Sequence, residues 1–279
     1  MTAPTTLPER DAQRTDEAPA DPAREARATP AAKARAYFVH VYTASGVAFA
    51  FLALREMLLP GLDPVAHPEV DARWVFGWLV AAVLVDATDG PLARAWHVKS
   101  LAPSIDGRTI DDILDYLTFG FLPLALVYVK GWLPDVVCWT VAAGMLASLL
   151  GFASVKAKEE GDGFFRGFPS YWNVYAFYAG LLAGVWDGWF NAVLLWTLAV
   201  LVVCPIRLIY PNLAPPPWKP AVLGGAAVWT LIMLAMLPGY PDNPPWLVAV
   251  SLIYPAFYTV LSVVLDVKSR RTARPDITT

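Results

Sequence analysis

Aspartates are the residues of this 279-residue sequence whose types and spacing point most clearly to chemistry. Asp86 and Asp89 are three positions apart, and Asp111 and Asp115 are four apart. On helices, each of these pairs lies on one face. Asp112 is rotated by about 100° from its neighbour and lies off that face. We therefore expect two acidic helix faces that can meet at one depth.

Four carboxylates at one site repel one another, so they need compensation. Two divalent cations would supply four positive charges, and they prefer the hard oxygen ligands that carboxylates offer. The alternative is that these aspartates cap helices or pair with Arg94 and Arg108. That explanation suits a single aspartate at a helix start, such as Asp112, better than four in register.

Small residues flank the acids. Gly90 and Ala93 follow the first pair, and Gly107 precedes the second. One interpretation is helix packing through small side chains. The other is space for a flat base or a diphosphate close to the backbone, with Arg94 placed to meet phosphate oxygens.

The composition indicates that these acids are held by membrane helices. The chain is 57% hydrophobic and 16% charged, with a mean hydropathy of +0.46, whereas soluble domains carry roughly 25% charged residues. Soluble, disordered and fibrous classes are therefore excluded. A net charge of −3 offers no electrostatic footprint for nucleic acid. Cys138 and Cys204 lie in separate apolar runs and predict no disulfide framework.

Apolar windows predict an all-α polytopic membrane protein with eight transmembrane helices, at residues 37–59, 74–95, 110–129, 132–155, 170–186, 188–210, 219–238 and 246–267. The predicted organisation is a disordered cytoplasmic tail (1–36), a six-helix catalytic core (37–212), two additional transmembrane helices (213–268) and a cytoplasmic tail (269–279). Most of the 21 lysines and arginines then fall on the side of the termini, as the positive-inside rule requires. The acidic pairs lie just inside that cytoplasmic boundary.

The order D-x-x-D-G-x-x-A-R (86–94), then G-x-x-x-D-x-x-x-D (107–115), resembles the signature of the CDP-alcohol phosphotransferase family. The twelve-residue gap between the two parts (95–106), the eight spans and the stretches 39–46 and 164–173 resemble its bacterial phosphatidylcholine synthase branch. The resemblance to the family covers about residues 37–212. The last two spans are accounted for only by the branch.

This resemblance implies a six-helix core, a homodimer and two Mn²⁺ or Mg²⁺ ions bound by Asp86, Asp89, Asp111 and Asp115. It also implies that Gly90, Ala93 and Gly107 make room for cytidine and ribose. Asp115 would be the general base that takes the proton of the acceptor hydroxyl. The implied reaction transfers a phosphatidyl group from CDP-diacylglycerol to choline, giving phosphatidylcholine and CMP at the cytoplasmic side of a bacterial inner membrane.

A quaternary ammonium has no N–H donor and favours aromatic faces. Candidate choline contacts are Tyr171, Trp172 and Tyr175, beside Asn173. The alternative for these aromatics is an interfacial belt.

Other polar residues also lie near the predicted cytoplasmic surface. Arg207 could contact a substrate phosphate or serve as a positive-inside anchor. Thr43 and Ser45 are placed near the nucleotide. His40 is expected to be a hydrogen-bonded interfacial residue rather than a zinc ligand, because the other histidines lie in other segments.

Two alternatives stay open at this stage. The first is the same chemistry with serine, inositol or a glycerol phosphate as acceptor. The second is a cation-coupled transporter, since acids within the membrane also build ion pathways. Acids that cluster near one surface, with glycines beside them, favour the enzyme.

Overall fold

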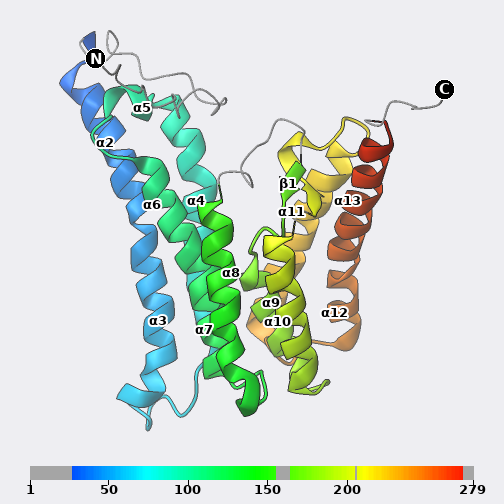
Figure 1. Cartoon of the computed structure of the whole chain (residues 1–279). Helices are drawn as coiled ribbons and strands as arrows, with labels where there is room; N and C mark the ends of the chain where they lie inside the picture. Colours follow the sequence, from blue (N-terminus) through cyan, green and yellow to red (C-terminus); the bar gives the residue numbers. More distant parts are fainter. Residues whose placement is uncertain (1–26, 155–163, 205, 273–279) are drawn as a thin grey trace, which may run out of the picture.

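The computed structural model describes residues 27–154, 164–204 and 206–272, most of which are helical (Figure 1). The α-helices are α2 (Pro30–Ala44), α3 (Gly46–Leu62), α4 (Ala72–Ala95), α5 (Val98–Leu101), α6 (Gly107–Asp115), α7 (Leu122–Val129), α8 (Val141–Ala153), α9 (Trp172–Leu182), α10 (Gly188–Val203), α11 (Lys219–Met236), α12 (Pro245–Ser251) and α13 (Ile253–Thr272). The shorter elements are the π-helix η1 (Tyr116–Phe121), the 3₁₀-helices η2 (Asp135–Thr140), η4 (Pro211–Leu213) and η5 (Leu237–Gly239), and strands β1 (Phe164–Arg166) and β2 (Arg207–Ile209).

Within the described residues, six helices are long and apolar enough to cross a membrane: Pro30–Leu62, Ala72–Ala95, Gly107–Val129, Asp135–Ala153, Lys219–Gly239 and Pro245–Arg270. The helical, polytopic class predicted from the sequence is therefore confirmed. The other two expected spans correspond to α9, with 11 residues, and α10, with 16. At about 1.5 Å per residue, both are shorter than a hydrocarbon core of about 30 Å. The count of eight crossings stays a prediction.

The first helix begins earlier than expected. α2 starts at Pro30, inside the segment 1–36 that we expected to be a disordered tail. Thr29 explains this start, because its side chain accepts a hydrogen bond from the Ala32 amide and a proline follows at the first helical position. The expectations for residues 1–26 and 273–279 lie outside the described residues.

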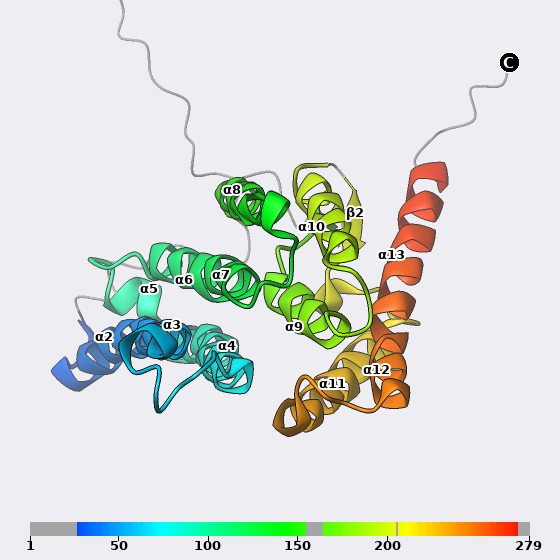
Figure 2. The ribbon, with the colours of Figure 1, turned by 90° about the horizontal axis from the view of Figure 1, so that it is seen from below.

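The helices form two groups that meet at α9. Seen end-on (Figure 2), α2 to α7 lie on one side, α11 to α13 on the other, and α9 lies between them. Eight of the eleven residues of α9 are buried, and seven of these belong to one core cluster with side chains of α4, α7 and α10. α9 is therefore an internal helix that joins the two groups. α2 begins and α13 ends at the same end of the molecule (Figure 1).

A small ribbon, absent from the all-α prediction, joins the segments that follow α8 and α10 to the last helix. β1 pairs antiparallel with β2, with Phe164 opposite Ile209 and Arg166 opposite Arg207. Three bonds then attach β2 to α13. Arg207 Nε donates to Asp266 Oδ1 (2.5 Å), the Ile209 amide donates to Ser262 Oγ (3.2 Å), and Tyr258 Oη donates to the Ile209 carbonyl.

Candidate active site

α4 and α6 present the aspartates because both helices are regular where the acids lie. α4 runs without interruption to Ala95, so Asp86 and Asp89 are one turn apart. α6 begins at Gly107 because Asp106 caps it: its carboxylate accepts from the amides of Arg108 (3.1 Å) and Thr109 (3.4 Å) and from the Thr109 hydroxyl (2.8 Å). These hydrogen bonds, the one from the Thr109 hydroxyl first, hold the pKa of Asp106 below its usual range despite partial desolvation.

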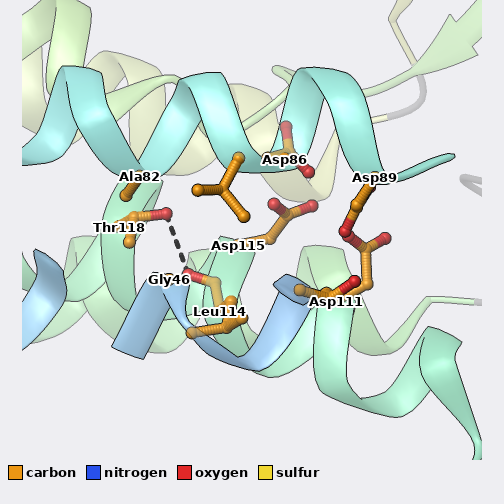
Figure 3. A pocket seen from close by; sticks show the side chains of 10 residues that line it. Gly46, Ala82, Asp86, Asp89, Asp111, Leu114, Asp115 and Thr118 are labelled. Carbon is orange, nitrogen blue, oxygen red and sulfur yellow. Dashed lines mark hydrogen bonds between the residues drawn. The ribbon is translucent and has the colours of Figure 1, made fainter. Parts of the chain in front are cut away.

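The acids of the two helices converge (Figure 3). One carboxylate oxygen from each of Asp86, Asp89 and Asp111 lies within 4.8 Å of the other two. Asp115 points toward Asp86 from the facing helix (Figure 3). The prediction that the acidic faces of the two helices meet is thereby confirmed for Asp86, Asp89 and Asp111. Asp115 lines the same cavity.

That cavity is small, about 10 Å³. It is lined by the four aspartates together with Thr43, Gly46, Ala82, Val85, Leu114 and Thr118. A volume of this size holds one water-sized group, so any larger ligand of these acids would lie on the open side of the cavity. Among the described residues, none that lines the cavity is a lysine or arginine.

Thr118 and the helix around it were missed by the sequence analysis. Thr118 is buried, lines the cavity, and donates its hydroxyl to the Leu114 carbonyl (2.9 Å, the dashed line in Figure 3). It lies in the π-helix η1, which follows Asp115 directly. The spacing 111–115–118 continues one helical face and could have indicated this residue. π-helical turns are rare and are frequent at functional sites.

The donor set fits a divalent cation. Three carboxylates that share a 4.8 Å neighbourhood, without a basic residue in the described lining, would repel one another strongly. Hard oxygen donors are the ligands that Mg²⁺ and Mn²⁺ prefer. The arrangement therefore suits metal-assisted chemistry on an anionic group.

Comparison with known proteins decides between the classes that such a site allows. Residues 39–206 match the family model described as CDP-alcohol phosphatidyltransferase. The chain belongs to the CDP-alcohol phosphatidyltransferase family. The matched region contains both acidic helices and every residue that lines the cavity.

Individual relatives carry a more specific name. A phosphatidylcholine synthase from Legionella pneumophila is 35% identical over 234 residues, covering 81% of this chain and 87% of that protein. Phosphatidylcholine synthases from Rhizobium johnstonii and Rhizobium meliloti are 32% and 30% identical, covering 84% and 86% of this chain and 92% and 95% of their own lengths.

Of the residues predicted to contact the nucleotide, some lie at the cavity or leave open space, and others are engaged elsewhere in the protein. Thr43 lines the cavity, and its hydroxyl donates to the Val39 carbonyl (3.1 Å). Gly90 is open: within the described residues, a methyl group there would meet only Arg94 Nη1, at 3.5 Å. Ser45, by contrast, donates its hydroxyl to the Tyr42 carbonyl (2.6 Å) and is not part of the cavity lining.

Gly107 is small for a reason that the sequence did not reveal. A methyl group on Gly107 would lie 2.9 Å from Cε1 of His40, which is buried on α2. The His40 ring also lies 3.4 Å, through Nε2, from the carbonyl of Ala102. The missing side chain therefore makes room for His40. His40 is hydrogen-bonded, as expected, and holds the loop before α6 against α2.

The aromatic candidates for choline are separated by burial. Trp172 is fully buried between Phe168 and Tyr175, and Tyr175 is buried with its hydroxyl donating to the Asn191 carbonyl (2.9 Å). These two rings therefore present no free face in this structure, and their role as choline contacts stays a prediction. Asn173 Oδ1 accepts from the amide of the next residue. Tyr171 is 46% exposed and retains the role of a candidate.

Arg207 does not line the acidic cavity. Its Nε lies 2.5 Å from Asp266 of α13, and its guanidinium lies over the Phe164 ring at 4.8 Å from the centroid. The structure thus shows a residue that connects β2 to the last helix, and a contact with substrate phosphate stays a hypothesis.

Proposed function

We propose that this chain is a phosphatidylcholine synthase, which transfers the phosphatidyl group of CDP-diacylglycerol to choline and releases CMP. The observation that carries the proposal is the acidic cluster on α4 and α6. It lies in a chain that is similar over most of its length to proteins named phosphatidylcholine synthase. A site near one end of long apolar helices suits a donor with two acyl chains in lipid and a nucleotide in water.

In this proposal, Asp86, Asp89, Asp111 and Asp115 would hold two Mg²⁺ or Mn²⁺ ions. Bound there, such ions would neutralise the diphosphate and stabilise charge on the departing CMP. The open backbone at Gly90 and the small side chain of Ala93 would let the nucleotide approach α4, and Arg94 would donate to phosphate oxygens.

The reaction balances as one displacement. The choline hydroxyl oxygen attacks the phosphorus that carries diacylglycerol, and the bond from that phosphorus to the CMP oxygen breaks. Asp115 accepts the hydroxyl proton. It is the last residue of α6, and its side chain faces Asp86 (Figure 3). CMP leaves with the electron pair of the broken bond.

We further propose that the protein lies in the bacterial inner membrane, with both termini and the acidic cavity on the cytoplasmic side. This orientation places most basic residues on that side. A homodimer is proposed from the family resemblance.

The test is an acceptor comparison with purified protein in lipid nanodiscs. We expect CDP-diacylglycerol, labelled choline and Mn²⁺ to give labelled phosphatidylcholine and equimolar CMP, and we expect EDTA to abolish both. Product with serine, inositol or glycerol phosphate, but not with choline, would overturn the acceptor assignment. Absence of CMP with every acceptor would favour a transporter.

A further inference from the structure

Five aromatic residues extend from the acidic site to the last helices, and we call them the aromatic wall: Tyr171, Tyr210, Trp229, Tyr254 and Tyr258. The Tyr254 ring lies 6.0 Å from the Trp229 ring and 6.3 Å from the Tyr258 ring, with interplanar angles of 33° and 29°. All five residues are partly or largely solvent-accessible rather than buried. The wall is therefore a set of neighbouring rings with accessible surface.

The polar atoms of these rings are largely committed to the protein. Tyr254 Oη donates to the Val222 carbonyl (2.9 Å), and Tyr258 Oη donates to the Ile209 carbonyl. Trp229 Nε1 donates to the hydroxyl of Tyr178 (3.3 Å). Each bond fixes a ring and uses its donor, so what the rings offer a ligand is chiefly their π-faces.

The wall begins beside the acids. The Tyr171 ring lies 6.0 Å from the ring of Phe119, which belongs to the π-helix after Asp115. Tyr171 lies within electrostatic range of Asp86 and Asp115, and also of Tyr210 and Tyr254. Tyr258 lies within the same range of Tyr171. An acceptor whose hydroxyl is near Asp115 therefore has aromatic surface within its own neighbourhood.

Four of the five wall residues lie beyond the family-wide region, which ends at residue 206. Three relatives named phosphatidylcholine synthase align over 81–86% of this chain, which is more than 206 of its 279 residues, so their alignments continue past residue 206, whereas others align over 64–78%. The acidic chemistry thus belongs to the shared core, whereas most of the wall belongs to the helices that follow it.

We propose that the aromatic wall binds the trimethylammonium group of the acceptor, so that α11 and α13 give the enzyme its selectivity for choline. The inference rests on the proposed function, and it assigns the acceptor site of that reaction. A quaternary ammonium cannot donate a hydrogen bond, and accessible π-faces with no net charge attract it. In this proposal the aromatic wall takes the role first predicted for Trp172 and Tyr175, whose rings are buried.

Two adjacent glycines of α11 allow a matched test. A methyl group on Gly225 would lie 2.7 Å from two ring carbons of Tyr254, whereas one on Gly224 meets nothing within 4 Å among the described residues. Both Gly→Ala changes favour the helix equally. We expect Gly225→Ala to displace the Tyr254 ring and raise KM for choline several-fold, with KM for CDP-diacylglycerol unchanged. Gly224→Ala should leave both values unchanged.

A second experiment isolates the role of charge. The acceptor is choline or its neutral isostere, 3,3-dimethylbutan-1-ol, and CMP release is measured for each. We expect the wild type to prefer choline, and Tyr254→Leu to lower that preference about tenfold, an effect between those of an exposed and a desolvated cation–π contact. Tyr254→Phe keeps the ring and should stay close to wild type. Trp246→Leu, an exposed ring on α12, is the control.

The outcomes separate the two claims. If the wild type forms no phosphatidylcholine from choline, the proposed function fails and the wall has no choline to bind. If the wild type does form it, but Tyr254→Leu and Gly225→Ala keep the preference for choline over the isostere, the function stands and the aromatic wall is wrong. Equal use of the neutral isostere and of choline by the wild type would also contradict the proposed role of the aromatic wall.

Discussion

Single side chains already divide into those that face the cavity and those that do not. Asp111 contributes an oxygen to the 4.8 Å cluster, while its neighbour Asp112 is not part of the cavity lining. We expect Asp111→Asn to lower kcat/KM by more than about a hundredfold, since losing a group that merely supports a metal ligand costs about 10–100-fold. Asp112→Asn should retain most activity. Equal losses in CMP release for the two variants would contradict the face assignment.

Gly90 offers a second residue-level prediction, because its surroundings are open. A methyl group there fits the structure, so Gly90→Ala should insert and unfold like wild type. Activity should nevertheless fall about a hundredfold, the cost of displacing a bound substrate by the order of 1 Å. Gly77→Ala, on the same helix and with nothing within 4 Å of the added methyl group among the described residues, is the matched control. Unchanged kcat/KM in Gly90→Ala would show that the nucleotide does not approach this backbone.

The sequence predicted the register of the acids but not the identity of the aromatic contacts. Helical periodicity alone determines which aspartates share a face, so Asp86, Asp89 and Asp111 could be assigned in advance. Burial of Trp172 depends on helices that pack around α9 from both sides, and no local pattern contains that information. The sequence did not indicate Tyr254 either, because only tertiary packing brings this residue, far along the chain, toward the acids.

At the scale of elements, α2 and α6 are fitted to each other through Gly107 and His40. Gly107→Ala would bring a methyl group 2.9 Å from the His40 ring, and such overpacking typically costs about 1–3 kcal/mol. We expect a lower thermal unfolding temperature in detergent. His40→Ala removes the obstacle, so the double variant should be more stable than additivity predicts. Strict additivity of the two changes would contradict this contact.

Local signals explain the helix starts, whereas element lengths follow from tertiary packing. Thr29 and Asp106 are recognisable N-caps, and both begin helices in the structure. The break at Ser45, the π-turn after Asp115 and the short β1–β2 ribbon have no comparable signature in the sequence. The ribbon forms because α13 supplies partners for its edge.

At the scale of the molecule, Asp266 links the final helix to strand β2. Its carboxylate pairs with Arg207, which is 17% exposed, and with Arg270, which is 59% exposed. Asp266→Ala should lower the free energy of unfolding by about 2 kcal/mol, less than the roughly 3–5 kcal/mol of a fully buried pair. Arg270→Ala should cost under about 1 kcal/mol. Thermal unfolding in detergent compares the two, and equal effects would argue against the link.

The common end shared by the start of α2 and the finish of α13 imposes a parity rule on the whole chain (Figure 1). A path that leaves and returns to one side of a bilayer traverses it an even number of times. α9 and α10 must accordingly be counted together: both traverse, giving eight passes, or neither does, giving six. A label at the short turn between them, around Asp187, would report the side of the membrane on which this turn lies. That result distinguishes eight passes from six.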